Sequence, residues 1–271
     1  MQQTEDRRRE TRVALDLPAV LSTNSSTKPS REVKAQTVNL SLKGCAVVCG
    51  NSIPHDAECV VRLGSILNPE INHEYPARNI WVSPDSHQVG LEFSSIPGPL
   101  AAELSKVLEL AKWIKRDRFS INMTVFLKDT NAEGNVYFAR YFDWQGMARE
   151  AFFRQLLGES VAVFTSGQLR LITVDAAIHF RHELRLFDEV VIRVQPTNTR
   201  HTSVDLLFSY LKTNGEEIAT GKQTIAFASP SGSLIPIPRQ VLEAGRTYLN
   251  DIEQLRLLYY LEKPEHQSAA R

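Results

Sequence analysis

The chain has 271 residues, of which 42% are hydrophobic and 23% are charged. This length predicts two domains, each large enough to hold its own core. Lys plus Arg and Asp plus Glu both number 31, so the chain lacks the broad positive field of a general nucleic-acid-binding protein. Any site for an anion must therefore be local.

Three cysteines, Cys45, Cys49 and Cys59, share no metal-ligand spacing with nearby histidines. Their odd number, together with the lack of a signal-peptide pattern, argues against a disulfide framework and favours the reducing cytoplasm. No apolar run approaches the roughly 20 residues that a membrane helix requires. We therefore expect a cytoplasmic protein without a metal, a cofactor or a membrane insertion.

The first hundred residues predict a β-rich domain. Residues 1–12 are polar and charged and predict a mobile basic arm, and the alternating run VALDLPAVLS predicts the first strand. Short β-like runs separated by Gly, Pro, Asn and Asp then predict a small antiparallel barrel or sandwich. These runs are residues 34–40, 45–49, 58–63, 75–82 and 88–93.

A helix is predicted to join the two domains. Apolar residues recur at spacings of three and four between 100 and about 115, after which Lys115, Arg116 and Arg118 suit the negative end of a helix dipole. We place the domain boundary near 117, which gives a first domain of residues 1–117 and a second of 118–271.

The second half predicts an α+β domain, with an antiparallel sheet wrapped around a largely buried helix. A strand from Phe119 leads through a turn at Gly134 into an aromatic-rich helix that ends at Gly158, and a hairpin is expected around Asn214-Gly215. The remaining predicted strands are residues 160–164, 169–182 and 189–196, and the tail from Pro236 is predicted to be helical.

An arginine cluster and a turn motif stand about thirty residues apart near the N-terminus. Arg8, Arg9 and Arg12 provide planar charged groups that clamp phosphates or pair with guanine. The second motif, residues 39–44, contains Asn39, Ser41 and Gly44; Asn and Ser reach a base edge, and glycine permits a close backbone approach. Either motif alone also fits a solvated tail or a plain turn.

Together, RRETR and NLSLKG resemble the PilZ family of cyclic di-GMP receptors, whose marks are RxxxR and [D/N]xSxxG. The sequence VGLEF at residues 89–93 also resembles the last strand of that family. The resemblance implies a six-stranded barrel, cyclic di-GMP as a regulatory ligand, and contacts from Arg8, Arg9, Arg12, Asn39, Ser41 and Gly44. The alternative is a PilZ-like domain that no longer binds the ligand.

The stretch from Asp129 to Glu150, DTNAEGNVYFARYFDWQGMARE, carries the chemistry of the second domain. Cleavage of a thioester requires a polarised carbonyl, and the start of a buried helix offers backbone N–H donors and a positive dipole end. We expect Val136 and Tyr137 to supply these donors. Asn131 stands just before them, where a polar side chain positions water or the acyl group.

This stretch resembles the hotdog thioesterases of the 4-hydroxybenzoyl-CoA type, except that their catalytic Asp is Asn131 here. An amide cannot act as a carboxylate base or nucleophile. The runs NxxGNVY and WQGxxRE are more similar to the enediyne-polyketide thioesterases, which release an acyl chain from a carrier protein. That resemblance implies Asn131 and Arg149 as the functional pair.

Several roles within this stretch remain open. Arg149 otherwise forms a salt bridge with Glu150, with Glu133 or with a neighbouring subunit, since a buried guanidinium needs a partner. Glu150 is the remaining candidate for a general base, or a surface residue. Tyr137 and Tyr141 line an acyl channel or belong to the core.

The combined prediction is a PilZ barrel followed by a hotdog domain that hydrolyses an acyl-CoA or acyl-carrier-protein thioester under the control of cyclic di-GMP. Hotdog sites are usually built across subunits, so the resemblance implies a homodimer or a dimer of dimers. The alternative is a non-catalytic cyclic di-GMP effector whose hotdog domain serves dimerisation or acyl binding.

Overall fold

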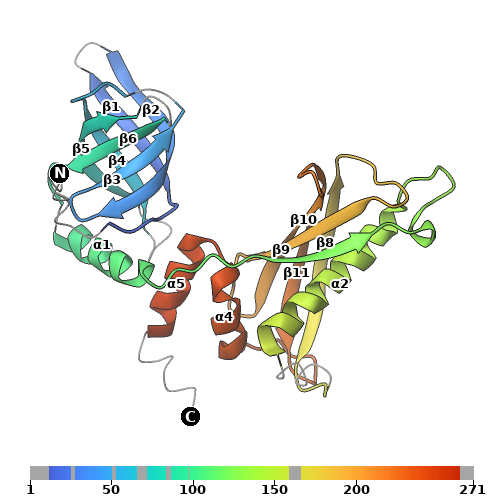
Figure 1. Cartoon of the computed structure of the whole chain (residues 1–271). Helices are drawn as coiled ribbons and strands as arrows, with labels where there is room; N and C mark the ends of the chain where they lie inside the picture. Colours follow the sequence, from blue (N-terminus) through green and yellow to red (C-terminus); the bar gives the residue numbers. More distant parts are fainter. Residues whose placement is uncertain are drawn as a thin grey trace, which may run out of the picture. The chain divides into compact units, whose positions relative to one another are not determined.

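A computed structural model describes residues 12–25, 28–50, 53–65, 72–83, 87–96, 98–158 and 166–262. The chain divides into two compact units (Figure 1). One unit runs to Ile114 and also includes the chain from Gln254 onward, and the other spans Lys115–Glu253. The predicted strand at 160–164, Arg8 and Arg9 lie outside the described residues.

The first unit is a closed antiparallel barrel with the strand order β1-β2-β3-β6-β5-β4, which confirms the predicted six-stranded barrel. Its core is built by alternation, because successive side chains of a strand point to opposite faces. In β4, for example, Cys59, Val61 and Leu63 are buried. The strands are β1 (Pro18–Ser25), β2 (Lys28–Ser41), β3 (Gly44–Cys49), β4 (Glu58–Gly64), β5 (Asn72–Val82) and β6 (Gln88–Phe93).

Helix α1 (Gly98–Ala111) packs on this barrel. Leu104, Val107 and Leu110 are buried, and Glu103 receives a hydrogen bond from Ser65 Oγ at 2.7 Å and lies 2.6 Å from His73 Nε2. The helix ends at Ala111, before the basic residues predicted to lie near its end. Arg116 instead pairs with Asp251 within the second unit, with two nitrogen–oxygen distances of 3.0 and 2.6 Å.

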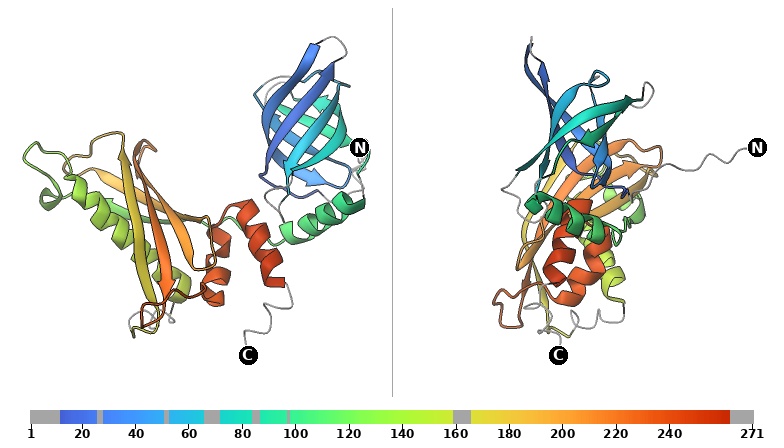
Figure 2. Two further views of the ribbon diagram at one scale, coloured as in Figure 1. Left: turned by 180° about the vertical axis from the view of Figure 1, so that it is seen from behind. Right: turned by 90° about the vertical axis from the view of Figure 1, so that its left-hand side faces the viewer.

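The second unit is a five-stranded antiparallel sheet in the order β7-β9-β10-β11-β8, with helix α2 (Phe138–Leu157) along one face (Figure 2). This arrangement confirms the predicted α+β layout. The strands are β7 (Phe119–Thr124), β8 (Arg170–Phe180), β9 (Glu189–Thr197), β10 (Ser203–Lys212) and β11 (Glu217–Ala228). The tail of this unit forms α4 (Arg239–Gly245) and the 3-10 helix η3 (Arg246–Tyr248), and the last helix, α5 (Asp251–Glu262), belongs from Gln254 onward to the first unit.

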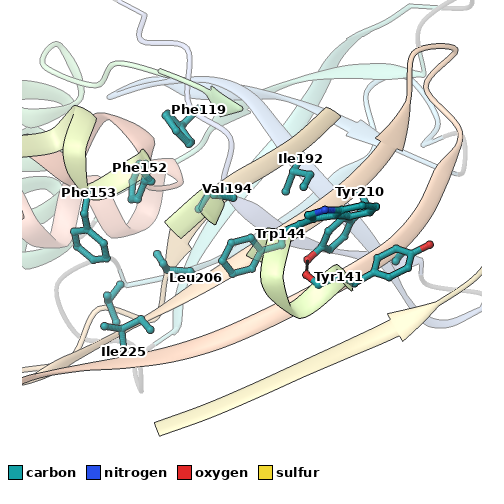
Figure 3. Packing of buried hydrophobic residues seen from close by; sticks show 14 of the residues in the cluster. Phe119, Tyr141, Trp144, Phe152, Phe153, Ile192, Val194, Leu206, Tyr210 and Ile225 are labelled. Carbon is teal, nitrogen blue, oxygen red and sulfur yellow. Dashed lines mark hydrogen bonds between the residues drawn. The ribbon is translucent and has the colours of Figure 1, made fainter. Parts of the chain in front are cut away.

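The core of this unit lies between α2 and the sheet. Trp144, Phe152 and Phe153 of α2 are buried against strand residues such as Leu206 and Ile225 (Figure 3). The hydroxyl of Tyr210 donates a 2.9 Å hydrogen bond to the carbonyl of Tyr141, which satisfies both buried groups.

The prediction that α2 is largely buried is wrong on one side. Phe138, Phe142 and Met147 are 55%, 37% and 51% exposed. Their apolar character suggested burial, but only the stripe of the helix that meets the sheet is covered. The chain alone therefore leaves an apolar surface open on α2.

A buried carboxylate stabilises the sheet on the face away from α2. Asp205 is fully buried and accepts hydrogen bonds from Arg200, Asn198 and Thr224, and Lys222 Nζ lies 3.0 Å from its Oδ2. Burial acts to raise the pKa of Asp205, but these hydrogen bonds outweigh it and hold the pKa below its usual range.

We expect Asp205→Asn to lower the free energy of unfolding at pH 7 by about 2 kcal/mol, because two cations lose their common partner. A depressed carboxyl pKa contributes stability above the unfolded pKa of about 4, and this contribution is lost as the pH falls through the folded pKa. Urea unfolding should therefore show that the difference in the free energy of unfolding between wild type and variant becomes smaller below about pH 4. The exposed Asp175→Asn is the control, and an equal loss in both variants would contradict the role of Asp205.

Candidate functional site

The loop between β7 and α2 is held by Asp129. Its carboxylate Oδ2 accepts the N–H of Phe126 at 3.0 Å, and its carbonyl accepts the N–H of Tyr137 at 2.9 Å. The residue is buried and forms the end of the 3-10 helix η1 (Leu127–Asp129). This carboxylate is therefore occupied in shaping the loop.

Asn131 lies exposed at the beginning of the next turn. Its Oδ1 accepts the N–H of Glu133 at 2.9 Å, and its carbonyl accepts the N–H of Gly134 at 3.0 Å. Gly134 has a φ of 82°, a left-handed conformation that favours glycine. Within the described residues Nδ2 of Asn131 has no hydrogen-bond partner, so this side chain keeps a free donor.

The backbone donors predicted at the helix start are already occupied. Val136 N donates to the carbonyl of Leu184 at 2.9 Å, and Tyr137 N donates to that of Asp129. Helix α2 begins only at Phe138, with Tyr137 as its extended N-cap residue. Because the first N–H groups of a helix have no intrahelical acceptor, those of Phe138 and Ala139 are the donors that this helix offers. The sequence pointed to the turn glycine and so placed the start two residues too early.

The side chains around this start are accessible. Tyr137 and Phe138 are exposed, and their rings lie 4.6 Å apart. Tyr141, by contrast, belongs to the core, where burial raises its pKa to about 12 and Asp188 and Glu183 add to the shift. Of the two tyrosines considered for an acyl channel, only Tyr137 is therefore open to a ligand in this chain.

Arg149 lies just past the middle of α2, eight residues before its last residue, Leu157. Its side chain is 20% exposed, its Nη1 donates a 2.7 Å hydrogen bond to Thr173 Oγ1 of β8, and its Nη2 lies 3.6 Å from Glu150. Glu150 is 76% exposed, which leaves it in water beside the guanidinium. This exposure fits the surface role of Glu150 better than the role of a general base, whose pKa is usually raised by burial.

One chain does not bring Asn131 and Arg149 together. Eleven residues separate Phe138 from Arg149, which is about 16 Å along a helix that rises 1.5 Å per residue. Asn131 precedes the helix start, and among the described residues its hydrogen bonds stay within its own turn. In each chain, Asn131 therefore lies before the start of α2 and Arg149 lies about three turns along it.

The open edge of the sheet lies beside Arg149. Among the described strands, β8 pairs with β11 alone and forms one edge of the sheet. Val174 and Phe180 of this strand are exposed, as is Met147 of α2. An edge strand with exposed apolar side chains is a surface on which another strand readily pairs.

The barrel brings part of its two predicted motifs together. Val13 and Leu40 exchange two backbone hydrogen bonds of 3.0 Å, which places Arg12 opposite Ser41 and close to Asn39. Arg12 is exposed. Burial raises the pKa of the Cys45 thiol to about 12, and Cys59 adds to this rise. The Arg12 guanidinium acts to lower the same pKa, so the charge of Arg12 is felt at this end of the barrel.

The residues of the NLSLKG motif divide into two kinds. Ser41 is buried and uses its hydroxyl within the turn, toward the Gly44 carbonyl and the Lys43 N–H, both at 3.2 Å. A Cβ at Gly44 would lie 2.0 Å from the carbonyl oxygen of Leu91, so glycine is required there by strand packing. Asn39, in contrast, has a buried Oδ1 without a hydrogen-bond partner among the described residues. Asn39 and Arg12 are thus the described groups free to meet a ligand.

In the parts of the chain that the structure describes, no three His, Cys, Asp or Glu side chains are grouped as a metal ion would require. No helix of the same parts is long and apolar enough to span a membrane.

Two family matches cover most of the chain. Residues 6–109 match the PilZ domain, and residues 125–245 match the thioesterase-like superfamily. A search of curated proteins gave no match.

Solved structures of thioesterases are similar to about half of this chain. The dynemicin thioesterase is 29% identical, with 49% of this chain and 98% of that chain covered and a TM-score of 0.45. A gentisyl-coenzyme A thioesterase is 25% identical, with 47% and 99% covered and a TM-score of 0.43. A 1,4-dihydroxy-2-naphthoyl-CoA thioesterase from Synechocystis is 18% identical, with 48% and 96% covered and a TM-score of 0.44.

Proposed function

Because this chain joins a PilZ domain to a hotdog domain of the thioesterase-like superfamily, we propose that it is a cyclic di-GMP-responsive acyl thioesterase. Its substrate is an acyl-CoA or acyl-carrier-protein thioester. The observation that carries the proposal is the accessible start of α2, where the N–H groups of Phe138 and Ala139 lie beyond the Asn131 turn.

Catalysis at such a site rests on positioning and electrostatics. The N–H donors at the helix start and the positive end of the helix dipole stabilise the oxyanion that forms when water attacks the thioester carbonyl. The carbon–sulfur bond then breaks and releases a carboxylic acid and a thiol. Asn131 Nδ2 and the Arg149 guanidinium supply further donors to the acyl oxygens and the attacking water.

The functional pair requires two copies of the chain. Since Arg149 lies about 16 Å along α2 from its first residue, Phe138, and Asn131 precedes that residue, we assign each site to Asn131 of one copy and Arg149 of the other. The exposed edge strand β8, with Val174 and Phe180, supports a homodimer formed through this edge. Such a dimer contains two equivalent sites.

The regulatory ligand is assigned to the end of the barrel that carries Arg12. Cyclic di-GMP presents two phosphates and two guanines, which suit the Arg12 guanidinium and the Asn39 Oδ1, an acceptor without a partner among the described residues. Arg8 and Arg9, which precede Arg12 in the sequence, are the other arginines that the PilZ resemblance assigns to the ligand. Ser41 and Gly44 contribute through the shape of the turn.

A second function is favoured by the state of Asn131. Its side chain is an amide, and its Oδ1 already accepts the N–H of Glu133. Both facts suit a non-catalytic hotdog domain that dimerises or binds acyl groups under the control of cyclic di-GMP.

A panel of acyl-CoA and acyl-carrier-protein thioesters separates the two functions. The enzyme predicts turnover of at least one thioester by the full chain. Binding of a thioester without turnover supports the acyl-binding module. If no thioester of the panel is either hydrolysed or bound, the result contradicts the proposed thioesterase.

A further inference from the structure

Strand β8 contains an irregularity opposite β11. Asp175 pairs with Thr224, but the next pair joins Thr173 to Ile225, so Val174 is an extra residue in β8. This is a β-bulge, in which two residues of one strand oppose one residue of its neighbour. Val174 is exposed at this point.

The bulge changes the face on which Thr173 lies. Thr224 donates to Asp205 on the side of the sheet away from α2, and its partner Asp175 shares that side. In a regular strand, residues two apart share a face, so Thr173 would also point away from α2. The bulge pairs Thr173 with Ile225 of the core beneath α2, and so turns it toward the helix.

On that face, Thr173 meets the guanidinium of Arg149. The Oγ1 to Nη1 distance is 2.7 Å, at the short end of the usual range for a hydrogen bond from a charged donor. Glu150, the other contact of this guanidinium, lies 3.6 Å away and is mostly exposed. No further partner of this guanidinium lies among the described residues, so its remaining N–H groups are available for a ligand while one nitrogen is held.

We infer that Thr173 is a positioning residue, which fixes the Arg149 guanidinium for the acyl thioester. This inference rests on the proposed function of Arg149. A long arginine side chain has many rotamers, and ordering it before the substrate arrives lowers the entropy that binding and catalysis must overcome. A bulge that re-aims one side chain is a common device beside functional sites.

The test compares Thr173→Val with Thr173→Ser. Valine keeps the branched shape that suits a strand and removes the hydroxyl, and serine keeps the hydroxyl. We expect Thr173→Val to lower the kcat for thioester hydrolysis about tenfold, and Thr173→Ser to restore at least half of the wild-type kcat. The melting temperature should change little, because the hydrogen bond is exposed.

Two further variants separate this inference from the proposed function. Thr220→Val, on the neighbouring strand and on the other face, should keep the wild-type kcat. If Arg149→Ala loses activity but Thr173→Val does not, the positioning role of Thr173 is wrong. The role is also wrong if the kcat of Thr173→Ser is as low as that of Thr173→Val. If Arg149→Ala keeps full activity, the proposed role of Arg149 is wrong instead.

A binding measurement tests the same inference if the protein does not hydrolyse a thioester. Calorimetry with a non-hydrolysable acyl-CoA thioether should show about tenfold weaker binding for Thr173→Val, and recovery for Thr173→Ser. Equal affinity in all three proteins overturns the inference. A wild-type chain that neither hydrolyses thioesters nor binds the thioether overturns both the proposed function and this inference.

Discussion

Replacing Asn131 or Arg149 by alanine should lower the kcat for acyl-thioester hydrolysis by roughly a hundredfold or more, because loss of one donor to the acyl oxygens has an effect of this size. Steady-state kinetics with the best thioester of the panel measures the change. Asn122→Ala, which replaces an exposed asparagine on β7 outside the proposed site, is the control and should match the wild type. Full activity in both site variants would remove the pair from the mechanism.

Mixing the two inactive variants tests whether the site is shared between subunits. When Asn131→Ala and Arg149→Ala chains are unfolded and refolded together, half of the dimers contain one of each. Such a dimer has one site with both residues intact, so about a quarter of the wild-type activity should return. A mixture that stays inactive, although size analysis shows mixed dimers, would contradict a shared site.

Arg12→Ala should weaken the binding of cyclic di-GMP by about tenfold to a hundredfold, since a guanidinium that contacts a phosphate contributes charge-assisted hydrogen bonds. Isothermal titration calorimetry measures the affinity. Arg78→Ala is the matched control, because Arg78 is exposed on the same barrel and pairs with Glu92 at 3.6 Å. We expect Arg78→Ala to bind cyclic di-GMP with the same affinity as the wild type.

The salt dependence of this binding provides a second check. A contact between a guanidinium and a phosphate is screened by ions, so the affinity of the wild type should fall with added salt more steeply than that of Arg12→Ala. Equal slopes, or equal affinities in low salt, would exclude Arg12 from the site.

Local sequence patterns were sufficient to predict most of the helices and strands. Asn214-Gly215 predicted the β10–β11 turn, and Gly215 does adopt a φ of 88° there. Short β-like runs between turn residues predicted the barrel strands, and β4 and the middle of β5 bury every second side chain. Periodicity was less informative for α2, because Met147 and Phe142 are apolar yet exposed, and a sequence does not tell a core face from a face left open for another surface.

Details that depend on pairing between distant segments could not be read from the sequence. The N–H groups of Val136 and Tyr137 are consumed by the carbonyls of Leu184 and Asp129, and the first of these is almost fifty residues away. The position of Thr173 depends on one extra residue opposite β11, whose register is fixed only when the sheet forms. Gly44 fits a ligand-binding motif, but its close neighbour is the backbone of Leu91.

The central claim is that cyclic di-GMP controls acyl-thioester hydrolysis by this chain. A regulatory ligand acts only if it binds two states of the protein with different affinity. The most direct test measures hydrolysis by the full-length wild type and by Arg12→Ala, each with and without saturating cyclic di-GMP. We predict a severalfold change in kcat or KM for the wild type and none for the variant. Unchanged kinetics in a wild-type protein that calorimetry shows to be saturated with cyclic di-GMP would contradict the claim.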